Sequence, residues 1–250
     1  MSPEKPIIVI VHGAWQGPHQ YAPLTQSLND KGFTVMQPAN PSTSQNRAEV
    51  AGKTCYDDAN NIRTVMEEPL AAGKEVVMVC HSYGGIPGTL SLEGFQTTDR
   101  QAKGLQGGVK RVVYISSFAL PAQDMSACDF LGGSYPPNMD RQDDCVAILD
   151  GSIFDEMDEE TRASLMSTLA FQSTASLETR VHFVGHQLTI PKTYISCLTD
   201  TAIPLEAQRA MIAQLGEGTS VEELKCGHIP FLIPRVKSEL VDMIERAALT

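Results

Sequence analysis

The chain lacks paired cysteines, long hydrophobic runs and an excess of positive charge. No apolar stretch approaches the ~20 residues needed to span a bilayer, and only Lys5 precedes the first apolar run, which is too short for a signal peptide. We therefore expect a soluble, cytoplasmic protein. No CxxC motif occurs, so we interpret the cysteines as reduced thiols of an intracellular protein rather than a disulfide framework. The six are Cys55, Cys80, Cys128, Cys145, Cys197 and Cys226.

Positive charge is scarce: 19 Lys and Arg stand against 30 Asp and Glu, which gives a net charge of −11. Between Asp124 and Glu160, eleven acidic residues accompany one basic residue, Arg141, so this segment alone carries −10. Such a segment disfavours nucleic acid and anionic membranes as partners, and we interpret it as a solvated surface. The expected partner is a small-molecule substrate, and the sequence leaves a homodimer open.

Buried-strand patterns alternate with amphipathic helices along most of the 250 residues, which is typical of a parallel α/β sheet flanked by helices. The length and the hydrophobic content of 42% suit one sizeable domain with an insertion. The predicted helices cover about 19–31, 54–72, 84–95, 205–215 and 235–248. The six predicted core strands are 7–11, 33–37, 76–80, 109–116, 193–198 and 220–226.

The alternation stops between residues 121 and 191, where no buried strand is predicted. Short helical patterns occur instead, the clearest at 159–171. We interpret this segment as a helical cap (lid) domain inserted after the fourth core strand. The predicted core then comprises residues 1–120 and 192–250, and the predicted cap comprises 121–191.

The stretch 76–85, VVMVCHSYGG, has the layout of a nucleophile elbow. An apolar strand ends in a tight turn that would push the Ser82 hydroxyl beyond the carboxyl end of the sheet, beside the amides of the next helix. Cys80 stands where the usual G-x-S-x-G pattern has its first glycine, and a thiol is small enough to fit at modest cost. Taken alone, Ser82 could also be an ordinary helix N-cap.

Two further residues follow later strands at the same edge of the predicted sheet. Asp200 follows the fifth core strand and His228 follows the sixth, so the chain order is Ser, Asp, His, as in α/β-hydrolases. A serine hydroxyl needs a base to remove its proton, and the histidine needs a carboxylate to fix its tautomer. Considered alone, an Asp in a loop after a strand is usually a helix cap, and a His that follows a glycine is usually a turn residue. Together the three residues predict a catalytic triad.

An oxyanion hole requires two amides, and we expect them from Tyr83, which follows the nucleophile, and from Ala14 in the loop after the first strand. His12 does not fit the triad order and is interpreted as a residue that braces this loop. His81 lies within the elbow and is expected to pack or to form structural hydrogen bonds.

A metal site is not expected. His182 and His186 have i, i+4 spacing, but Gly185 and β-branched neighbours argue against a helix there, and no third ligand is evident.

Four stretches carry a family resemblance: residues 7–15 (IIVIVHGAW), the elbow, residues 191–204 (PKTYISCLTDTAIP) with Gln208, and Gly227-His228. Together they resemble the α/β-hydrolase superfamily, and within it the group of methylesterases and hydroxynitrile lyases with its microbial relatives. The resemblance spans nearly the whole core and is weak in the cap. It implies a six-stranded parallel sheet, a helical cap over the site, no cofactor, and Ser82, Asp200 and His228 as the triad.

Two positions separate the lyases from the hydrolases of that group. The lyases tend to carry a threonine after the histidine of the first loop, where this chain has Gly13, and a lysine after the catalytic histidine, where it has Ile229. Without that cation, a cyanide leaving group has no evident partner. The resemblance therefore favours a hydrolase over a cyanide lyase.

We predict a serine hydrolase, specifically a carboxylesterase acting on a small to medium apolar or aromatic ester. The predicted pocket residues besides Tyr83 are Trp15, Phe118, Leu120, Ile229 and Phe231. The cap aromatics Phe130, Phe154 and Phe171 are weaker candidates, at least half of which we expect to pack between cap and core.

Three alternatives remain at this stage. The first is a non-hydrolytic enzyme on the same scaffold, such as a carbon–carbon lyase, cyclase or dehydratase that uses His228 as acid and base. The second is a ligand receptor derived from a hydrolase, against which the intact Ser, Asp and His argue. The third is a purely structural domain, which would leave the three residues at strand ends to chance.

Overall fold

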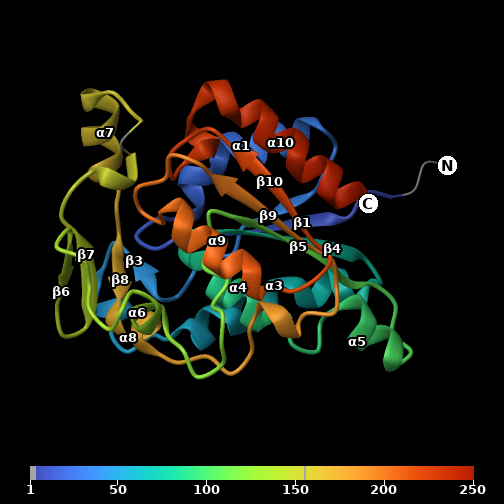
Figure 1. The fold of residues 1–250 in the computed structure, drawn as a ribbon. Helices are drawn as coiled ribbons and strands as arrows, with labels where there is room; N and C mark the ends of the chain where they lie inside the picture. The colour runs from blue at the N-terminus through green and yellow to red at the C-terminus, as the bar shows by residue number, and fades with distance from the viewer. Residues whose placement is uncertain (1–3, 155) are drawn as a thin grey trace.

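A six-stranded parallel sheet with the order β10-β9-β5-β4-β1-β2 forms the centre of the computed structural model, which describes residues 4–154 and 156–250 (Figure 1). Each strand overlaps its predicted position, so the predicted sheet is confirmed, although β2 is shorter than expected. The strands are β1 (Ile7–Val11), β2 (Val35–Met36), β4 (Glu75–His81), β5 (Gly108–Ile115), β9 (Lys192–Cys197) and β10 (Thr219–Leu224).

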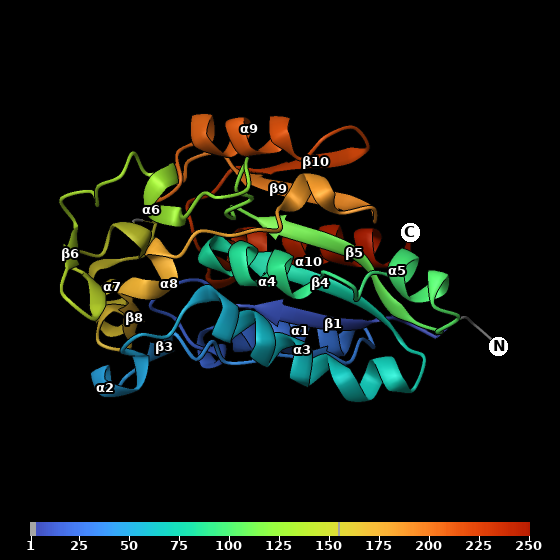
Figure 2. The same cartoon turned by 90° about the horizontal axis from the view of Figure 1, so that it is seen from below.

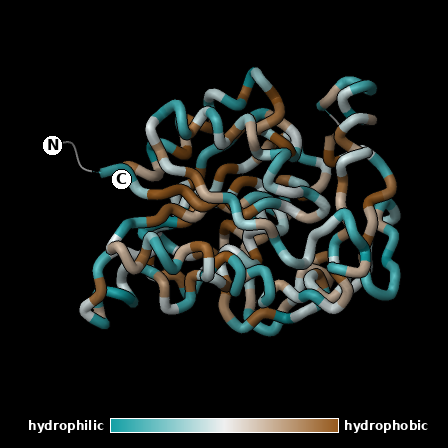
Figure 3. Tube along the Cα trace, turned by 180° about the vertical axis from the view of Figure 1, so that it is seen from behind, coloured by the Kyte–Doolittle hydropathy of each residue, from teal (hydrophilic) through white to brown (hydrophobic). Residues whose placement is uncertain are grey.

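Helices cover both faces of the sheet (Figures 1 and 2). The 3₁₀ turn η1 (Pro18–Tyr21), α1 (Ala22–Asp30) and α10 (Pro234–Leu249) pack on one face, and α3 (Cys55–Ala71), α4 (Gly85–Ser91) and α9 (Leu205–Gln214) pack on the other. Because β1 and β4 are buried on both faces over most of their length, they are mainly apolar, and Figure 3 shows hydrophobic (brown) stretches through the middle of the molecule.

The helix predicted over 84–95 is shorter in the structure. It ends at Ser91, and a separate helix, α5 (Thr97–Ala102), follows it. The stretch that forms α5 shows no amphipathic pattern in the sequence, because α5 buries none of its residues and so has no apolar face.

The segment after β5 contains helices, as predicted, but it also contains strands, which were not predicted. It contains β6 (Met139–Arg141), β7 (Cys145–Ile148) and β8 (Phe171–Ser173), which join β3 (Thr43–Ser44) in a four-stranded antiparallel sheet of order β3-β8-β7-β6. The helix expected over 159–171 ends at Met166, and Phe171 starts β8. These strands have three or four residues each, too few to produce a buried run in the sequence.

The remaining elements are short. Within the cap they are the helices α6 (Ala127–Phe130), α7 (Glu159–Met166) and α8 (Thr174–Glu178) and the 3₁₀ turns η3 (Ser152–Phe154) and η4 (Gly185–Gln187). In the core they are α2 (Arg47–Val50), η2 (Ser82–Gly84) and η5 (Pro230–Leu232). In Figure 1 the cap elements α6, α7 and α8 lie on the left of the molecule, with α7 above the other two.

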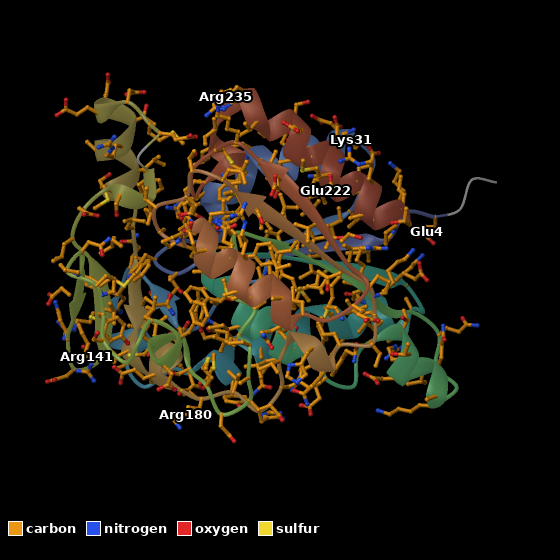
Figure 4. The ribbon with its side chains drawn as sticks, in the orientation of Figure 1. Glu4, Lys31, Arg141, Arg180, Glu222 and Arg235 are labelled. Atoms are coloured by element: carbon orange, nitrogen blue, oxygen red, sulfur yellow. The ribbon has the colours of Figure 1, made fainter. Side chains whose placement is uncertain are left out.

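Arginines outside the acidic segment pair with several of its carboxylates. Arg235 of α10 binds Glu156 and Arg180 binds Asp129, and Figure 4 shows both arginines at the rim of the molecule. The six cysteines are all free thiols. None of the helices formed by residues 4–154 and 156–250 has the length and apolar character that crossing a membrane requires.

Candidate active site

The elbow turns sharply between β4 and α4. Ser82 has a φ of 52°, in the left-handed region that residues with a Cβ rarely adopt. The two glycines that follow are required by close packing: a Cβ on Gly84 would overlap the carbonyl oxygen of Val11, and one on Gly85 would overlap that of Phe118. The Ser82 hydroxyl is therefore held at the carboxyl edge of the sheet, between the ends of β1 and β5.

The unusual Cys80 is accommodated by a glycine in the helix that passes over it. A Cβ on Gly88 of α4 would lie closer than 3.0 Å to the Cys80 Sγ, a separation that real Cβ atoms essentially never show. The space that the usual elbow glycine provides in the strand is thus provided here by the helix. Cys80 leaves the path of the elbow intact.

The structure brings Ser82, Asp200 and His228 into one hydrogen-bonded chain. The His228 Nε2 lies 2.9 Å from the Ser82 Oγ, and the His228 Nδ1 lies 2.7 Å from the Asp200 Oδ2. All three residues are buried, with at most 8% of their surface exposed. Because a carboxylate only accepts, the Nδ1 carries the proton and the Nε2 faces the serine as an acceptor.

Asp200 is held as an ionised acceptor by several donors. The Ser116 hydroxyl donates to its Oδ2, and the amides of Ala202 and Ile203 donate to its Oδ1 at 2.7 and 3.0 Å. Burial by itself would raise the pKa of Asp200, but His228 and these hydrogen bonds outweigh it and hold the pKa below its usual value. Ser116 is a site residue that was not predicted, although its place directly after β5 at the same sheet edge is a signal that could have identified it.

Two other histidines brace the site and stay neutral. The His81 Nε2 lies 2.8 Å from the carbonyl oxygen of His228, and its Nδ1 lies 2.7 Å from the Tyr21 hydroxyl. The His12 Nε2 accepts a hydrogen bond from the Asn40 amide at 2.9 Å. Burial lowers the pKa of His81 to about 3 and that of His12 to about 4. Both are therefore uncharged near neutral pH, and both have the bracing contacts expected of them.

The two residues predicted to supply the oxyanion-hole amides, Ala14 and Tyr83, line the same cavity as Ser82. Tyr83 is the second residue of η2, so its amide is one of those at the start of a helical turn that have no acceptor within the turn. In the part of the chain that the structure describes, the Ala14 amide has no hydrogen-bond acceptor either. Ala14 and Tyr83 both line the cavity that contains Ser82 and His228.

That cavity has a volume of about 270 Å³ and lies between the core and the cap. Its walls are mainly apolar and aromatic, and among the described residues that line it none is an Asp, Glu, Lys or Arg. Besides Ser82, His228, Ala14 and Tyr83, the lining residues are Trp15, Gln16, Phe118, Ala127, Leu131, Tyr135, Pro136, Asn138, Met139, Ile148, Ile153, Leu177, Thr201, Ala202, Ile203 and Pro204.

Of the predicted pocket residues, Trp15 and Phe118 line the cavity, whereas Leu120, Ile229 and Phe231 do not. Phe231 is fully buried and stacks on Tyr21 with a centroid distance of 4.2 Å. Ile229 is buried in the core on the α1 and α10 face of the sheet. Leu120 lines a separate small pocket together with the cap residues Val181 and Phe183. These three predictions were wrong because nearness in sequence to the triad does not fix the direction of a side chain.

The weaker cap candidates do not line the cavity, as the packing alternative predicted. Phe130 packs edge-on against Phe118, and Phe154 is buried in the core with Ile153. Phe171 pairs with Ser44 in the cap sheet. The cavity-lining stretch Thr201 to Pro204 was missed, although its position immediately after Asp200 is a signal that could have identified it.

His182 and His186 do not form a metal site with each other. The ring of His182 bonds to the Tyr56 hydroxyl and to Glu93, each at 2.8 Å, and His186 lies in η4. Residues 4–154 and 156–250 contain no group of three or more His, Cys, Asp or Glu side chains arranged to hold a metal ion.

Comparison with known proteins agrees with this architecture. The sequence profile of the Alpha/beta hydrolase family matches residues 8–236. The chain is 31% identical over 235 residues to a protein of Phoma sp. named "Probable hydrolase R7", and the match covers 90% of this chain and 92% of that protein.

Solved structures share the fold over nearly the whole chain. Polyneuridine aldehyde esterase superposes with a TM-score of 0.73 at 19% identity, covering 96% of this chain and 99% of that one. The methylesterase MES16 from Arabidopsis superposes with a TM-score of 0.70 at 16% identity, covering 96% and 97%. At these identities the likeness concerns the fold, and the resemblance to the methylesterase group is confirmed at that level. The chain belongs to the alpha/beta hydrolase family.

Proposed function

We propose that the protein is a serine carboxylesterase that cleaves an uncharged, small to medium apolar or aromatic ester. The observation that carries this proposal is the continuous hydrogen-bonded chain from Asp200 through His228 to Ser82, which ends at an apolar cavity. A nucleophile, a base and a residue that orients the base are thus within reach of one bound substrate.

In the first step, the His228 Nε2 takes the proton of the Ser82 hydroxyl while the Oγ attacks the ester carbonyl carbon. The negative charge moves to the carbonyl oxygen, where the amides of Ala14 and Tyr83 stabilise it. The tetrahedral intermediate then collapses, because His228 returns the proton to the leaving alkoxide, and an acyl-serine remains. Asp200 stays ionised and stabilises the imidazolium.

In the second step, His228 takes a proton from a water molecule, whose oxygen attacks the acyl carbon. Collapse of this intermediate returns the proton to the Ser82 Oγ and releases a carboxylic acid. The balance is one ester and one water consumed for one acid and one alcohol. No redox partner is required.

Two positions support hydrolysis over cyanide elimination. A Cβ at Gly13 would lie 3.0 Å from the Ser82 Cβ and 3.0 Å from the Gln16 Oε1, so the site has little room for the threonine that the lyases tend to carry. Ile229 stands where they tend to carry a lysine, and it is buried away from the cavity. A departing cyanide would therefore have no cation to stabilise it.

The cavity supports the substrate class. Because none of the described residues in its walls has a charged side chain apart from the catalytic histidine, an acyl group with a carboxylate or an ammonium would lose its hydration without a compensating partner there. Neutral apolar or aromatic groups gain from burial against Trp15, Phe118 and the cap side chains. The released acid is an anion, so the same walls favour its departure.

The proposal is tested by comparing wild type with Ser82→Ala on p-nitrophenyl esters that have short-chain, aromatic or carboxylate-bearing acyl groups. Intact-mass analysis follows the reaction with a fluorophosphonate in parallel. Ser238→Ala is the matched control, because Ser238 is an exposed serine on α10. We expect turnover and one covalent adduct in wild type and in Ser238→Ala, and neither in Ser82→Ala.

Neutral acyl groups should be cleaved at least about 10-fold faster, in kcat/KM, than carboxylate-bearing ones of similar size, because burying an unpaired charge is costly. A folded wild-type protein with neither turnover nor adduct would refute the esterase proposal. Equal activity on charged and neutral acyl groups would refute the assigned substrate class alone.

A further inference from the structure

Trp15, the neighbour of Ala14, is bound mainly by the cap. Its indole Nε1 donates to the carbonyl oxygen of Val146 at 2.7 Å, and its own carbonyl oxygen accepts from the amide of Ala170 at 2.7 Å. Its φ is 59°, a left-handed conformation that a bulky residue adopts only where the surroundings impose it. The loop that contains the Ala14 amide is therefore held in a strained path by contacts with the cap.

Gln172 of β8 is the centre of a buried polar network between cap and core. Its Oε1 accepts from the Thr43 hydroxyl at 2.7 Å and from the Trp15 amide at 3.4 Å. Its Nε2 donates to the hydroxyls of Ser42 at 2.9 Å and Ser176 at 2.6 Å. Gln172 is fully buried, so each of these bonds would be costly to lose.

The same network continues to the other amide donor. The Ser42 hydroxyl donates to the Asp58 Oδ2 at 2.6 Å, and the Ser42 amide donates to the Asp58 Oδ1 at 2.8 Å. The Tyr83 hydroxyl also donates to the Asp58 Oδ2, at 2.6 Å. The ring of Tyr83 is thus fixed at its far end, which limits the rotation of the backbone that follows Ser82.

We propose that Gln172 and Trp15 are positioning residues through which the cap aligns both amides of the oxyanion hole. One branch runs from Gln172 to Trp15 and so to Ala14, and the other runs through Ser42 and Asp58 to Tyr83. This inference rests on the proposed esterase function and adds that the hole has its working geometry only when β8 is seated against β3.

The physical reason is that an oxyanion hole must be preorganised. Two amides stabilise the developing charge only if their positions are fixed before the reaction, and each branch removes freedom from one of them. Neither branch touches the substrate carbonyl. Loss of a branch should therefore weaken stabilisation of the transition state and leave binding of the ester nearly unchanged.

The test uses three variants of the full chain. Trp15→Phe keeps an aromatic ring but removes the indole donor, Gln172→Met keeps the length but removes the polar atoms, and Tyr83→Phe removes one hydroxyl. The matched control is Arg47→Gln, which breaks a surface ion pair between core and cap (Arg47 with Asp144) that lies outside the network.

Three quantities are measured for each variant: kcat and KM on the best wild-type ester, and the affinity for a trifluoromethyl ketone with the same acyl group. That ketone forms a tetrahedral serine adduct with an oxyanion. We expect kcat to fall about 10- to 100-fold in the three variants and the ketone affinity to fall by a similar factor. KM should stay within about 3-fold in Gln172→Met and Tyr83→Phe. In Trp15→Phe, KM should rise as well, because the ring that lines the cavity becomes smaller. Arg47→Gln should stay within about 2-fold of wild type in all three.

The inference is overturned if folded Tyr83→Phe and Trp15→Phe keep kcat within about 2-fold, or if kcat falls without a parallel loss of ketone affinity. These two variants decide the matter even if Gln172→Met does not fold. Trp15 is the only tryptophan of the chain, so its emission in the other variants reports whether the cap is still seated. Absence of Ser82-dependent turnover in wild type would instead refute the proposed function.

Discussion

Cys80 and Gly88 should behave as a complementary pair in stability measurements. A Cβ at position 88 would come closer than 3.0 Å to the Cys80 Sγ, whereas nonbonded heavy atoms prefer about 3.5–4.0 Å. Cys80 is fully buried in the middle of the sheet, so its side chain cannot move into solvent to relieve the overlap. In Gly88→Ala, α4 must therefore shift outward.

Overpacking of this kind costs about 1–3 kcal/mol, and the helix regains up to about 1 kcal/mol from replacing glycine with alanine. We expect a net loss of about 1–2 kcal/mol. For a chain of 250 residues, this corresponds to a decrease in Tm of about 2–8 °C. Activity should also fall, because α4 begins directly after the turn that holds Ser82.

Adding Cys80→Gly to Gly88→Ala restores the usual elbow pattern and removes the overlap. Cys80→Gly alone should also lower Tm, since it leaves a small void under α4. The double variant should lie closer to wild type than the sum of the two losses, and a double-mutant cycle of Tm values measures the difference. If the two losses simply add, or if Gly88→Ala melts within about 1 °C of wild type, the complementarity argument is refuted.

Three further changes have definite expected outcomes. Asp200→Asn should lower kcat by about 10⁴-fold with the fold intact, because the amide no longer selects the His228 tautomer; a loss below about 10-fold in an ester assay would contradict this role. Gly84→Ala should destabilise more than Gly88→Ala, because its Cβ meets the backbone oxygen of Val11 rather than a side chain, and thermal melting ranks the two. Burial raises the pKa of Asp58 from 3.8 to about 6, so its ionisation costs the folded state about 3 kcal/mol at neutral pH. Wild-type stability should therefore decrease relative to Asp58→Asn as pH rises from about 4 to 6, and a pH-independent difference in Tm would contradict the raised pKa.

The core could be predicted from the sequence because its signals are local. A strand buried on both faces is apolar at each position, and the residues after successive parallel strands meet at one edge of the sheet. Those two rules placed Ser82, Asp200 and His228 at the same edge. The structure then added Ser116, which lies at that edge but has no distinctive sequence pattern.

The cap could not be predicted in the same way. Its strands β6, β7 and β8 are too short to show a period, and β8 finds its partner at Thr43 and Ser44, more than a hundred residues away. The lining of the cavity depends on how this sheet seats on the core. Phe231, which is close to His228 in sequence, consequently stacks on Tyr21, whereas Met139 and Ile148 from the cap line the cavity that contains Ser82.

Backbone strain also gathers at the site. Among the described residues, four non-glycine residues have a positive φ, and three of them, Trp15, Ser82 and Ser116, lie at the carboxyl edge of the sheet after β1, β4 and β5. Glycine would relieve a strain of about 1–2 kcal/mol at each position. Glycine would, however, also remove a side chain that forms a hydrogen bond at the site. These are the indole of Trp15, which bonds to the cap, the hydroxyl of Ser82, which bonds to His228, and the hydroxyl of Ser116, which bonds to Asp200. The fold therefore accepts strain at the three strand ends where a side chain is required, and uses glycine at positions 84, 85 and 88, where only space is required.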